Sequence, residues 1–391
     1  MRFLTAGESH GEALTVIMDE FPSGVDIDED FINSELSKRQ MGFGRGARMS
    51  IESDEVKILS GIKNGLSTGA PISFIISNND YINWKDKNEG LPVTNPRPGH
   101  ADLTGILKYR LKNIREVIER SSARETAARV GAGAFAKLFL RKFSIFIFSY
   151  VEQIGTVRID SGKYRKAVSS DFNPLKSKKD FDFLDVIENS IMRCPDPGAT
   201  GEMIKLVSKI SKEGDSLGGA VRVFASGLLP GLGSYTQWDL RLDAKMARAL
   251  MSIPSVKAVS FGLGDHAASI KGTEFHDEIY HNAGKGFYRK TNNAGGFEGG
   301  MTNGEFMDAG VVIKPIPTTT AGLRTVDTVT KKESVSFKER SDICAVPSIA
   351  LIAEAMVAIE LLNAMQDKFG KDSLAEISLN YKNYRKYIFE F

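Results

Sequence analysis

Short apolar segments bordered by glycine, asparagine or proline recur along the chain and predict β-strands. Most of them are rich in β-branched residues and too short for a stable helix, which favours strands. The predicted strands cover residues 13–18, 56–62, 72–77, 143–151, 220–226, 256–262 and 311–314.

Apolar residues spaced by three and four positions alternate with these segments and predict helices. Residues 122–125 have the S-x-x-E form of a capping box, which predicts that a helix begins at Ser122. Alanines and glycines between 127 and 136 would let another element approach this helix closely. The predicted helices cover residues 103–118 with a break near Asn113, the segment from Ser122 onward, and residues 196–214, 242–251 and 348–369.

Strands and helices are intermixed along the chain, without an internal repeat or a linker rich in Gly, Ser or Pro. This organisation predicts one α+β domain that spans residues 1–391. Residues 160–190 begin with a polar, lysine-rich stretch that has no clear period, and we expect a surface insertion there.

Composition narrows the class of protein. Hydrophobic residues make up 42% and charged residues 26%, which is typical of a soluble globular protein. The 51 basic and 49 acidic residues give a net charge of +2, which argues against a nucleic acid partner. Two isolated cysteines indicate neither a disulfide framework nor a zinc site, and no signal or membrane-spanning segment is predicted. We therefore expect a cytoplasmic protein without a membrane partner.

Two general motifs match the chain, but their sequence context argues against both. Residues 7–11, GESHG, match the G-x-S-x-G elbow of serine hydrolases, yet a β-branched segment follows where the elbow requires a helix. Residues 131–136 match the dinucleotide-binding pattern G-x-G-x-x-A, yet they lie inside a predicted helix. Close packing is the better interpretation of these glycines. A serine hydrolase that uses Ser9 stays open as the alternative function.

Two of the five histidines lie in short polar or turn-like settings, His10 in GESHG and His100 in RPGH. These positions favour a chemical role, although a structural hydrogen bond in a loop is an equal alternative for each histidine judged alone. The other three have acidic or amide neighbours and are expected at the surface: His266, His276 and His281.

Arginines are concentrated in the first third of the chain, beside glycine and proline turns. Guanidinium groups pair with carboxylates and phosphates, and neighbouring glycines let the backbone approach an anion. Solvated surface charge is the alternative for any one arginine, but the whole set predicts a small polyanionic substrate. Ser121 and Ser122 add a predicted helix start, a natural anion seat. The arginines are Arg39, Arg45, Arg48, Arg97, Arg120, Arg124 and Arg129.

Three later segments have compositions that suit a site better than a core. Residues 291–304 contain five glycines, which can admit a flat ring, although a surface hairpin is the alternative. Residues 314–320, KPIPTTT, place a lysine and three threonines at a predicted strand end, where they can hold a phosphate. Asp342 lies near Arg340 before the long apolar helix, which indicates an ion pair or, alternatively, proton transfer.

Six segments, in this order, resemble the motif series of the chorismate synthase family. They are GESHG, RPGHAD, RSSARETAARV, TNNAGGFEGG, KPIPT and RSDICAVP, and the match runs from residue 3 to about residue 369. The ordered series is far more specific than any single motif. The resemblance implies a β-α-β sandwich, with a helical layer between two antiparallel sheets, assembled as a homotetramer.

The resemblance also implies the reaction. Members of the family eliminate phosphate in the 1,4 sense from 5-enolpyruvylshikimate 3-phosphate, using reduced FMN without net oxidation, in the shikimate pathway. The substrate carries a phosphate and two carboxylates, which suit the arginine cluster. The sequence has no credible NADPH-binding loop, so we expect a separate flavin reductase. A non-enzymatic FMN-binding protein is a further alternative.

Residue roles follow from the resemblance, position by position. His10 would protonate the departing phosphate and His100 the reduced flavin ring. Asp342, relayed through Ser9, would assist removal of the C6 proton. Family substrate contacts map onto Arg39, Arg45, Arg48, Arg97, Arg129 and Arg340. Family FMN contacts map onto Arg120, Ser121, Ser122, Pro254, Ser255, Gly299, Lys314, Pro315, Ile316, Pro317, Thr318 and Arg340.

Overall fold

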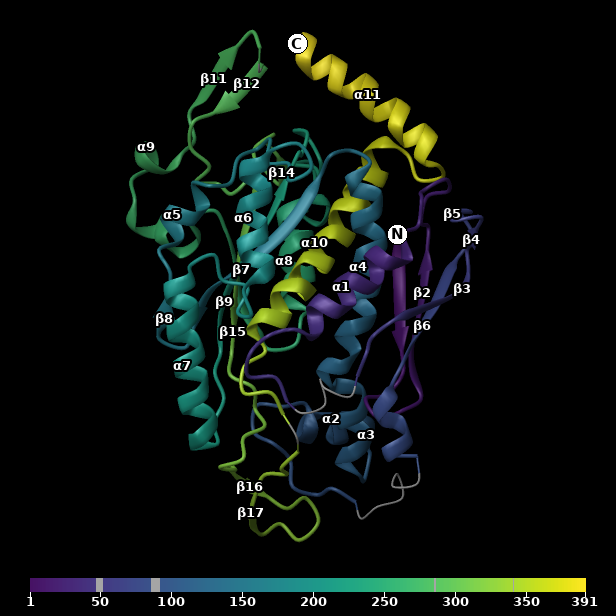
Figure 1. The fold of residues 1–391 in the computed structure, drawn as a ribbon, viewed down its shortest axis with the longest axis vertical. Coiled ribbons are helices and arrows are strands. Elements are labelled where there is room, and N and C mark those ends of the chain that lie inside the picture. Colours follow the sequence, from purple (N-terminus) through teal and green to yellow (C-terminus); the bar gives the residue numbers. More distant parts are fainter. Residues whose placement is uncertain (47–51, 86–91, 285, 340) are drawn as a thin grey trace.

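Two antiparallel sheets lie on either side of a layer of helices in the computed structural model (Figure 1). The structure describes residues 1–46, 52–85, 92–284, 286–339 and 341–391. The first sheet has the strand order β1-β2-β6-β3, and the second has the order β10-β15-β9-β7-β8. The strands are β1 (Arg2–Ala6), β2 (Ala13–Asp19), β3 (Val56–Ser60), β6 (Ile72–Ser77), β7 (Phe146–Ile154), β8 (Val157–Arg158), β9 (Gly219–Ser226), β10 (Val256–Phe261) and β15 (Met307–Ile313).

The helical layer carries the core. α4 packs against β1 and β2 of the first sheet, and α10 packs against α4 and against β7 and β9 of the second sheet. One continuous apolar cluster joins the three layers, so the expected sandwich is confirmed. The helices of this layer are α1 (Glu29–Gln40), α4 (Thr126–Arg141), α8 (Leu242–Met251) and α10 (Val346–Phe369).

The remaining elements surround the sandwich. A hairpin of β11 and β12 projects from the same end of the molecule as the C-terminal helix α11 (Figure 1). These elements are α2 (Asp102–Tyr109), α3 (Ile114–Ser121), α5 (Ser161–Arg165), α6 (Lys178–Asn189), α7 (Pro197–Glu213), α9 (Gly272–Phe275), α11 (Leu374–Glu390), β4 (Ile62–Lys63), β5 (Leu66–Ser67), β11 (Ile279–Asn282), β12 (Gly286–Arg289), β13 (Phe297–Glu298), β14 (Met301–Thr302), β16 (Arg324–Val326) and β17 (Glu333–Val335).

The structure confirms the predicted helix break near Asn113 and the predicted ends of the helix at Asp196 and Gly214. α2 and α3 replace the helix expected over residues 103–118, and the Asn113 side chain accepts a hydrogen bond from the Arg115 amide at the start of α3. Asp196 caps α7, and Gly214 ends it in the left-handed conformation that glycine favours.

Ser122 caps a helical turn that leads into α4, as predicted, but the reciprocal capping box is a wrong prediction. The Ser122 hydroxyl accepts a hydrogen bond from the Arg124 amide at 3.3 Å, in a 3₁₀ turn over Ala123–Glu125, and α4 begins only at Thr126. The Glu125 carboxylate does not return to the Ser122 backbone, because it instead pairs with Arg129 at 2.9 Å. An ion pair one helical turn away therefore replaces the expected reciprocal cap.

Residues 160–190 contribute to the core as well as to the surface. They contain α5 and α6, and Phe172 between these helices is buried and stacks on Phe148 of β7, with ring centroids 4.5 Å apart. The expectation of a surface insertion is therefore wrong for Phe172, whose isolated apolar side chain gave no periodic signal in a polar stretch.

α10 is long and apolar enough to cross a membrane by length and composition alone. However, 94% of its most apolar window is buried inside the protein. A helix buried between two sheets is apolar all round for that reason, so α10 is a core helix.

The small residues of α4 set the distance between the helices. A Cβ atom at Gly133 would lie 2.3 Å from the Cβ of Ala355 in α10, and one at Gly131 would lie 2.9 Å from the Phe74 ring of β6. The close-packing interpretation of residues 131–136 is confirmed, and their position inside α4 excludes a dinucleotide loop.

We predict that Gly133→Ala lowers the free energy of unfolding by about 1–3 kcal/mol, because the added methyl overpacks the contact between α4 and α10. The control is Gly201→Ala in α7, where an added Cβ meets nothing within 4 Å. That change should be neutral or stabilising, by up to about 1 kcal/mol. Urea denaturation of both variants measures the difference, and equal effects would contradict the packing argument.

Candidate active site

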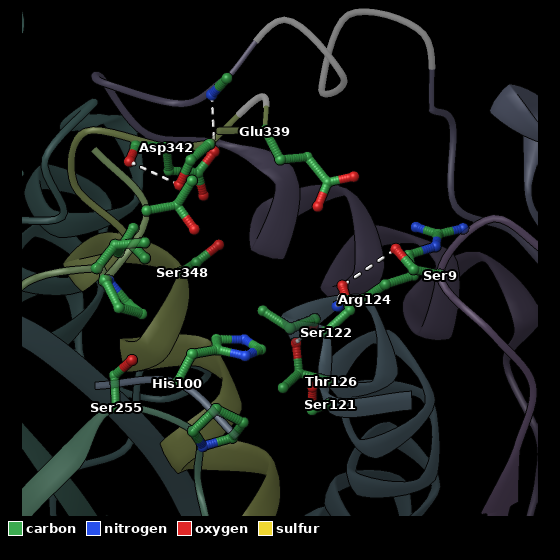
Figure 2. A pocket seen from close by; sticks show the side chains of 18 of the residues that line it. Ser9, His100, Ser121, Ser122, Arg124, Thr126, Ser255, Glu339, Asp342 and Ser348 are labelled. Atoms are coloured by element: carbon green, nitrogen blue, oxygen red, sulfur yellow. Dashed lines mark hydrogen bonds between the residues drawn. The ribbon is translucent and has the colours of Figure 1, made fainter. Parts of the chain in front are cut away.

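A cavity of about 410 Å³ lies where the N-terminal ends of α4 and α10 meet the loops that follow β1 and β15 (Figure 2). Its volume suits a small organic ligand. It collects predicted residues that are far apart in the sequence. These are Ser9, His10, Arg39, Arg45, Arg97, His100, Ser121, Ser122, Pro254, Ser255, Lys314, Ile316, Pro317, Thr318 and Asp342.

Four predicted residues do not line this cavity. Arg129 binds Glu125 and Ser252, while Arg120 donates hydrogen bonds to Thr5 and to the Gly7 carbonyl. Gly299 is exposed in the turn between β13 and β14, and Pro315 is absent from the lining although its neighbours are present. Predictions for Arg48 and Arg340 fall outside the described residues.

Positive charge dominates the described part of the lining. Five cationic side chains face two carboxylates there, and such an excess attracts anions. The cations are Arg39, Arg45, Arg97, Arg124 and Lys314, and the carboxylates are Glu339 and Asp342.

Asp54 holds two of these arginines from behind the cavity. Its carboxylate pairs with Arg39 at 3.2 Å and with Arg124 at 2.5 Å, and all three side chains are buried. Burial lowers the pKa of Arg39 to about 10 in spite of Asp54, so the guanidinium still carries its charge at neutral pH. Arg124 also lies 3.6 Å from the buried Glu52 carboxylate. Asp54 therefore orients both arginines, and Glu52 gives Arg124 a second carboxylate.

Lys314, at the end of β15, is a different kind of cation. Its ammonium donates a hydrogen bond to the Gly99 carbonyl, and it pairs with no carboxylate of the described residues. Burial and the neighbouring Lys257 lower its pKa. An anionic ligand group would relieve both effects, which makes Lys314 a natural phosphate partner.

Two helix N-termini add to the positive potential. α4 and α10 both begin at the cavity, where Ser122, Ala123, Ala345 and Ser348 are among the lining residues. The first amides of a helix lack intrahelical partners and carry a partial positive charge. The cavity therefore suits an anion at two sides.

His10 is buried and tied to α3 by Glu119. The two carboxylate oxygens accept hydrogen bonds from the His10 backbone amide and from Nδ1, each at 2.8 Å. Burial alone would raise the pKa of Glu119, but the bonds and charge of His10 outweigh burial and lower it. The imidazole ring also packs against Trp84, with ring centroids 4.0 Å apart and the two rings tilted by 32°.

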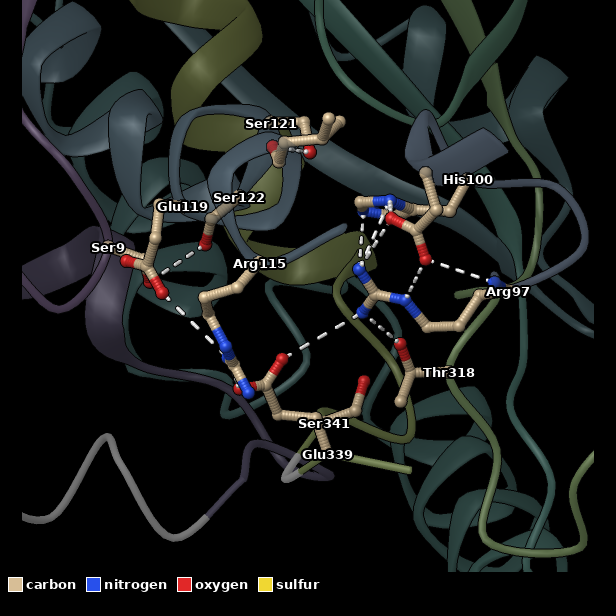
Figure 3. A network of polar contacts seen from close by, with 12 residues as sticks. Ser9, Arg97, His100, Arg115, Glu119, Ser121, Ser122, Thr318, Glu339 and Ser341 are labelled. Carbon is tan, nitrogen blue, oxygen red and sulfur yellow. Dashed lines mark hydrogen bonds and ion pairs between the residues drawn. The ribbon is translucent and has the colours of Figure 1, made fainter. Parts of the chain in front are cut away.

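His100 has an equivalent partner in Asp102, which is fully buried at the start of α2. Figure 3 shows His100 beside Arg97. Asp102 Oδ1 lies 2.5 Å from His100 Nδ1, and Asp102 Oδ2 accepts a hydrogen bond from Arg97 Nε at 2.8 Å. Burial alone would raise the pKa of Asp102, but these bonds hold it below its usual range. Arg97 also donates to Thr318 at 3.0 Å, which joins this group to the end of β15.

Asp342 and Ser9 lie at opposite sides of the cavity (Figure 2). Asp342 accepts a hydrogen bond from the Gly46 amide at 2.7 Å and pairs with Arg45 at 3.3 Å, whereas the Ser9 hydroxyl bonds to Ser122 at 3.1 Å. Asp342 thus forms an ion pair, but with Arg45. The expected partner, Arg340, lies outside the described residues. A relay between Asp342 and Ser9 needs a ligand or water between them.

The sequence-based search missed the two carboxylates that hold the histidines, Glu119 and Asp102, and the aromatic ring of Trp84. Asp102 is only two residues after His100 in RPGHAD, so spacing was a usable signal. Glu119 is 109 residues from His10, and only the folded chain joins them. The expected surface positions of the other three histidines are confirmed.

The serine-hydrolase alternative finds no support in the chain's geometry. β2 follows Gly11, as its β-branched pattern predicts, whereas a nucleophile elbow requires a helix after the serine.

The sandwich and its cationic cavity define an enzyme that acts on a small anionic substrate. A profile of the family described as chorismate synthase matches residues 1–366. A chorismate synthase from Carboxydothermus hydrogenoformans is 48% identical over 390 residues, which cover 98% of each chain, and one from Endomicrobium trichonymphae is 45% identical over 99% of each chain. A crystal structure of a chorismate synthase, 37% identical, superposes with a TM-score of 0.81 over 100% of this chain and 98% of that one. This chain belongs to the chorismate synthase family and is a carbon–oxygen lyase of aromatic amino acid biosynthesis.

We predict that Asp54→Asn lowers the free energy of unfolding by about 3–5 kcal/mol, because it leaves the buried Arg39 and Arg124 without their shared carboxylate. Thermal or urea denaturation measures this change. Asp26→Asn, which removes only an exposed pair with Lys142, should leave stability unchanged. A negligible effect of Asp54→Asn would show that the arginines do not depend on this ion pair.

Proposed function

We propose that the cavity binds 5-enolpyruvylshikimate 3-phosphate beside reduced FMN, and that the chain eliminates phosphate to give chorismate. The observation that carries this proposal is the meeting of five cations and two carboxylate-bound histidines in one cavity. The cations suit the phosphate and two carboxylates of the substrate. The histidines supply proton donors at a site where phosphate must leave.

The residues at one side of the cavity fit FMN. Lys314 offers a positive charge that no described carboxylate neutralises, and Ser121 and Ser122 offer hydroxyls near the start of α4. Pro317 and Ile316 offer apolar surface for a planar ring. When bound, reduced FMN would supply transient electron density that weakens the C–O bond.

The proposed roles of the chain's own residues follow from their contacts. Arg39, Arg45 and Arg97, each oriented by a carboxylate, bind the substrate anions. His10 donates a proton to the departing phosphate, and His100 holds or delivers a proton on the flavin side. Asp342, held by Gly46 and Arg45, assists removal of the C6 proton, with Ser9 as an auxiliary group.

Three further proposals rest on the resemblance and on composition. The chain assembles as a homotetramer, acts in the cytoplasm, and depends on a separate flavin reductase. The third is supported by the helical conformation of residues 131–136, which removes the one nicotinamide-loop match in the sequence. Sedimentation analysis tests the homotetramer directly. An assay with oxidised FMN, in which NADPH is the only electron donor, tests the dependence on a separate reductase.

We predict that the purified protein converts 5-enolpyruvylshikimate 3-phosphate to chorismate under anaerobic conditions with chemically reduced FMN. His10→Ala and His100→Ala should each lower kcat by about 10²- to 10⁴-fold, because each removes a proton donor. His276→Ala, an exposed histidine, is the matched control. A folded protein that forms no chorismate, beside an active relative assayed in parallel, would reject the proposed function.

We predict that Lys314→Met weakens FMN binding about 10-fold or more, because it removes the positive charge nearest the proposed phosphate seat. Flavin fluorescence titration measures the dissociation constant. Lys205→Met on the exposed side of α7 is the control and should leave it unchanged. Equal affinities for all three proteins would place the FMN phosphate elsewhere.

A further inference from the structure

Each histidine in the cavity is bonded at Nδ1 to a buried carboxylate: His10 to Glu119 of α3, and His100 to Asp102 two residues further along the chain. The side chain of Glu119 is 9% exposed and that of Asp102 is 0% exposed. Two such pairs in one cavity are more than core packing requires, because burying a carboxylate is unfavourable unless its partners offset the lost hydration.

We propose that Glu119 and Asp102 are positioning residues that fix both imidazoles with the proton on Nδ1, so that Nε2 is the atom that exchanges a proton in the cavity. The role of Nε2 in the reaction rests on the proposed function, whereas the position of the proton on Nδ1 does not depend on it. We further infer that Glu119 also supports positive charge on His10, whereas Asp102 mainly orients His100.

The protonation pattern at His10 follows from the acceptor. An ionised carboxylate only accepts hydrogen bonds, and the lowered pKa of Glu119 keeps it ionised. Both of its oxygens are used by His10, one at the amide and one at Nδ1, so Nδ1 carries a hydrogen. The Glu119 backbone carbonyl also accepts from the Ser9 amide at 3.0 Å, which fixes the loop that carries the ring.

The charged groups around His10 leave Glu119 with much of its charge. Arg115 lies 3.8 Å from the Glu119 carboxylate, but it forms its shorter pair, 2.8 Å, with Glu339. Trp84 covers one face of the imidazole and carries no charge. Glu119 is thus free to stabilise the cation that His10 becomes when Nε2 also holds a proton.

Asp102 has a different environment, because Arg97 already offsets its charge. Arg97 Nε donates to Oδ2 at 2.8 Å, and Arg97 Nη2 donates to Oδ1 at 3.1 Å. Nη2 also lies 3.1 Å from His100 Nδ1 and 3.4 Å from Nε2. Because the lowered pKa keeps Asp102 ionised and an ionised carboxylate only accepts, the hydrogen on Nδ1 points to Oδ1. Glu339 lies 4.0 Å from Arg97, and Lys314 bonds to the Gly99 carbonyl beside His100. The cations Arg97 and Lys314 therefore oppose extra positive charge on His100.

Neutral substitutions separate orientation from charge. In Glu119→Gln the amide has one acceptor and one donor, yet His10 presents two N–H groups, so the amide group favours moving the proton from Nδ1 to Nε2. We expect kcat to fall by about 10²- to 10⁴-fold, as for loss of a general acid. Glu119→Asp, which restores the charge, should recover at least part of this loss. Glu116→Gln, an exposed neighbour on α3, should leave activity unchanged.

A double-mutant cycle distinguishes positioning from a merely structural role. If Glu119 acts through His10, the double variant His10→Ala with Glu119→Gln should be no slower than His10→Ala alone, and the same holds for Asp102→Asn with His100→Ala. Losses that simply multiply would overturn the proposal while leaving the proposed function intact.

The histidine tautomers can also be measured by NMR spectroscopy, which does not require an active enzyme. In protein labelled with ¹⁵N only at histidine, His10 and His100 should resonate at alkaline pH with a protonated Nδ1 and a bare Nε2, and Glu119→Gln should shift His10 toward the other tautomer. The His10→Ala and His100→Ala spectra assign the signals. An Nε2–H tautomer at both rings would overturn the proposal, and absence of chorismate with the expected tautomers would reject only the proposed function.

Discussion

The close approach of α4 to α10 at Gly133 and Ala355 is the constraint on which the site depends. Any larger side chain at Gly133 would separate the two helices, since even a Cβ would lie 2.3 Å from its neighbour. Both helices begin at the same cavity and bring Thr126 and Ser348 to its wall. Core packing therefore sets the distance between two positively polarised helix ends.

Buried carboxylates then decide how the cavity's cations and histidines are presented. Asp54 joins Arg39 to Arg124, and Asp102 joins Arg97 to His100. Each pair offsets the unfavourable burial of a charge and removes the rotational freedom of a long side chain. Lys314 is the exception among the described lining cations, because it faces the cavity without a carboxylate. This arrangement gives a preorganised anion site in which the charge of Lys314 alone is not compensated by a described carboxylate.

The sequence predicted most of the fold, because periodicity records which faces are buried. β2, β6, β9, α7, α8 and α10 lie close to their predicted ranges. β1 and α1 were not predicted. The capping box predicted at Ser122 does not form, because the Glu125 carboxylate that it requires pairs with Arg129 instead. Local patterns cannot report such competition between side chains.

The site was predicted less completely, and for a different reason. The motifs identified most of the residues that line the cavity, but they also included Arg129 and Gly299, which the single chain directs elsewhere. Glu119 was missed because its partner lies 109 residues away. Motifs report residue types, whereas partners and directions depend on packing between distant segments.

A crystal structure of the protein grown with FMN and 5-enolpyruvylshikimate 3-phosphate tests the central claim most directly. The account predicts both ligands in the cavity between α4 and α10, with the flavin phosphate beside Lys314 and the substrate anions beside Arg39, Arg45 and Arg97. It also predicts Nε2 of His10 and of His100 facing the ligands. Ligands bound outside this cavity, or histidines turned away from them, would contradict the account.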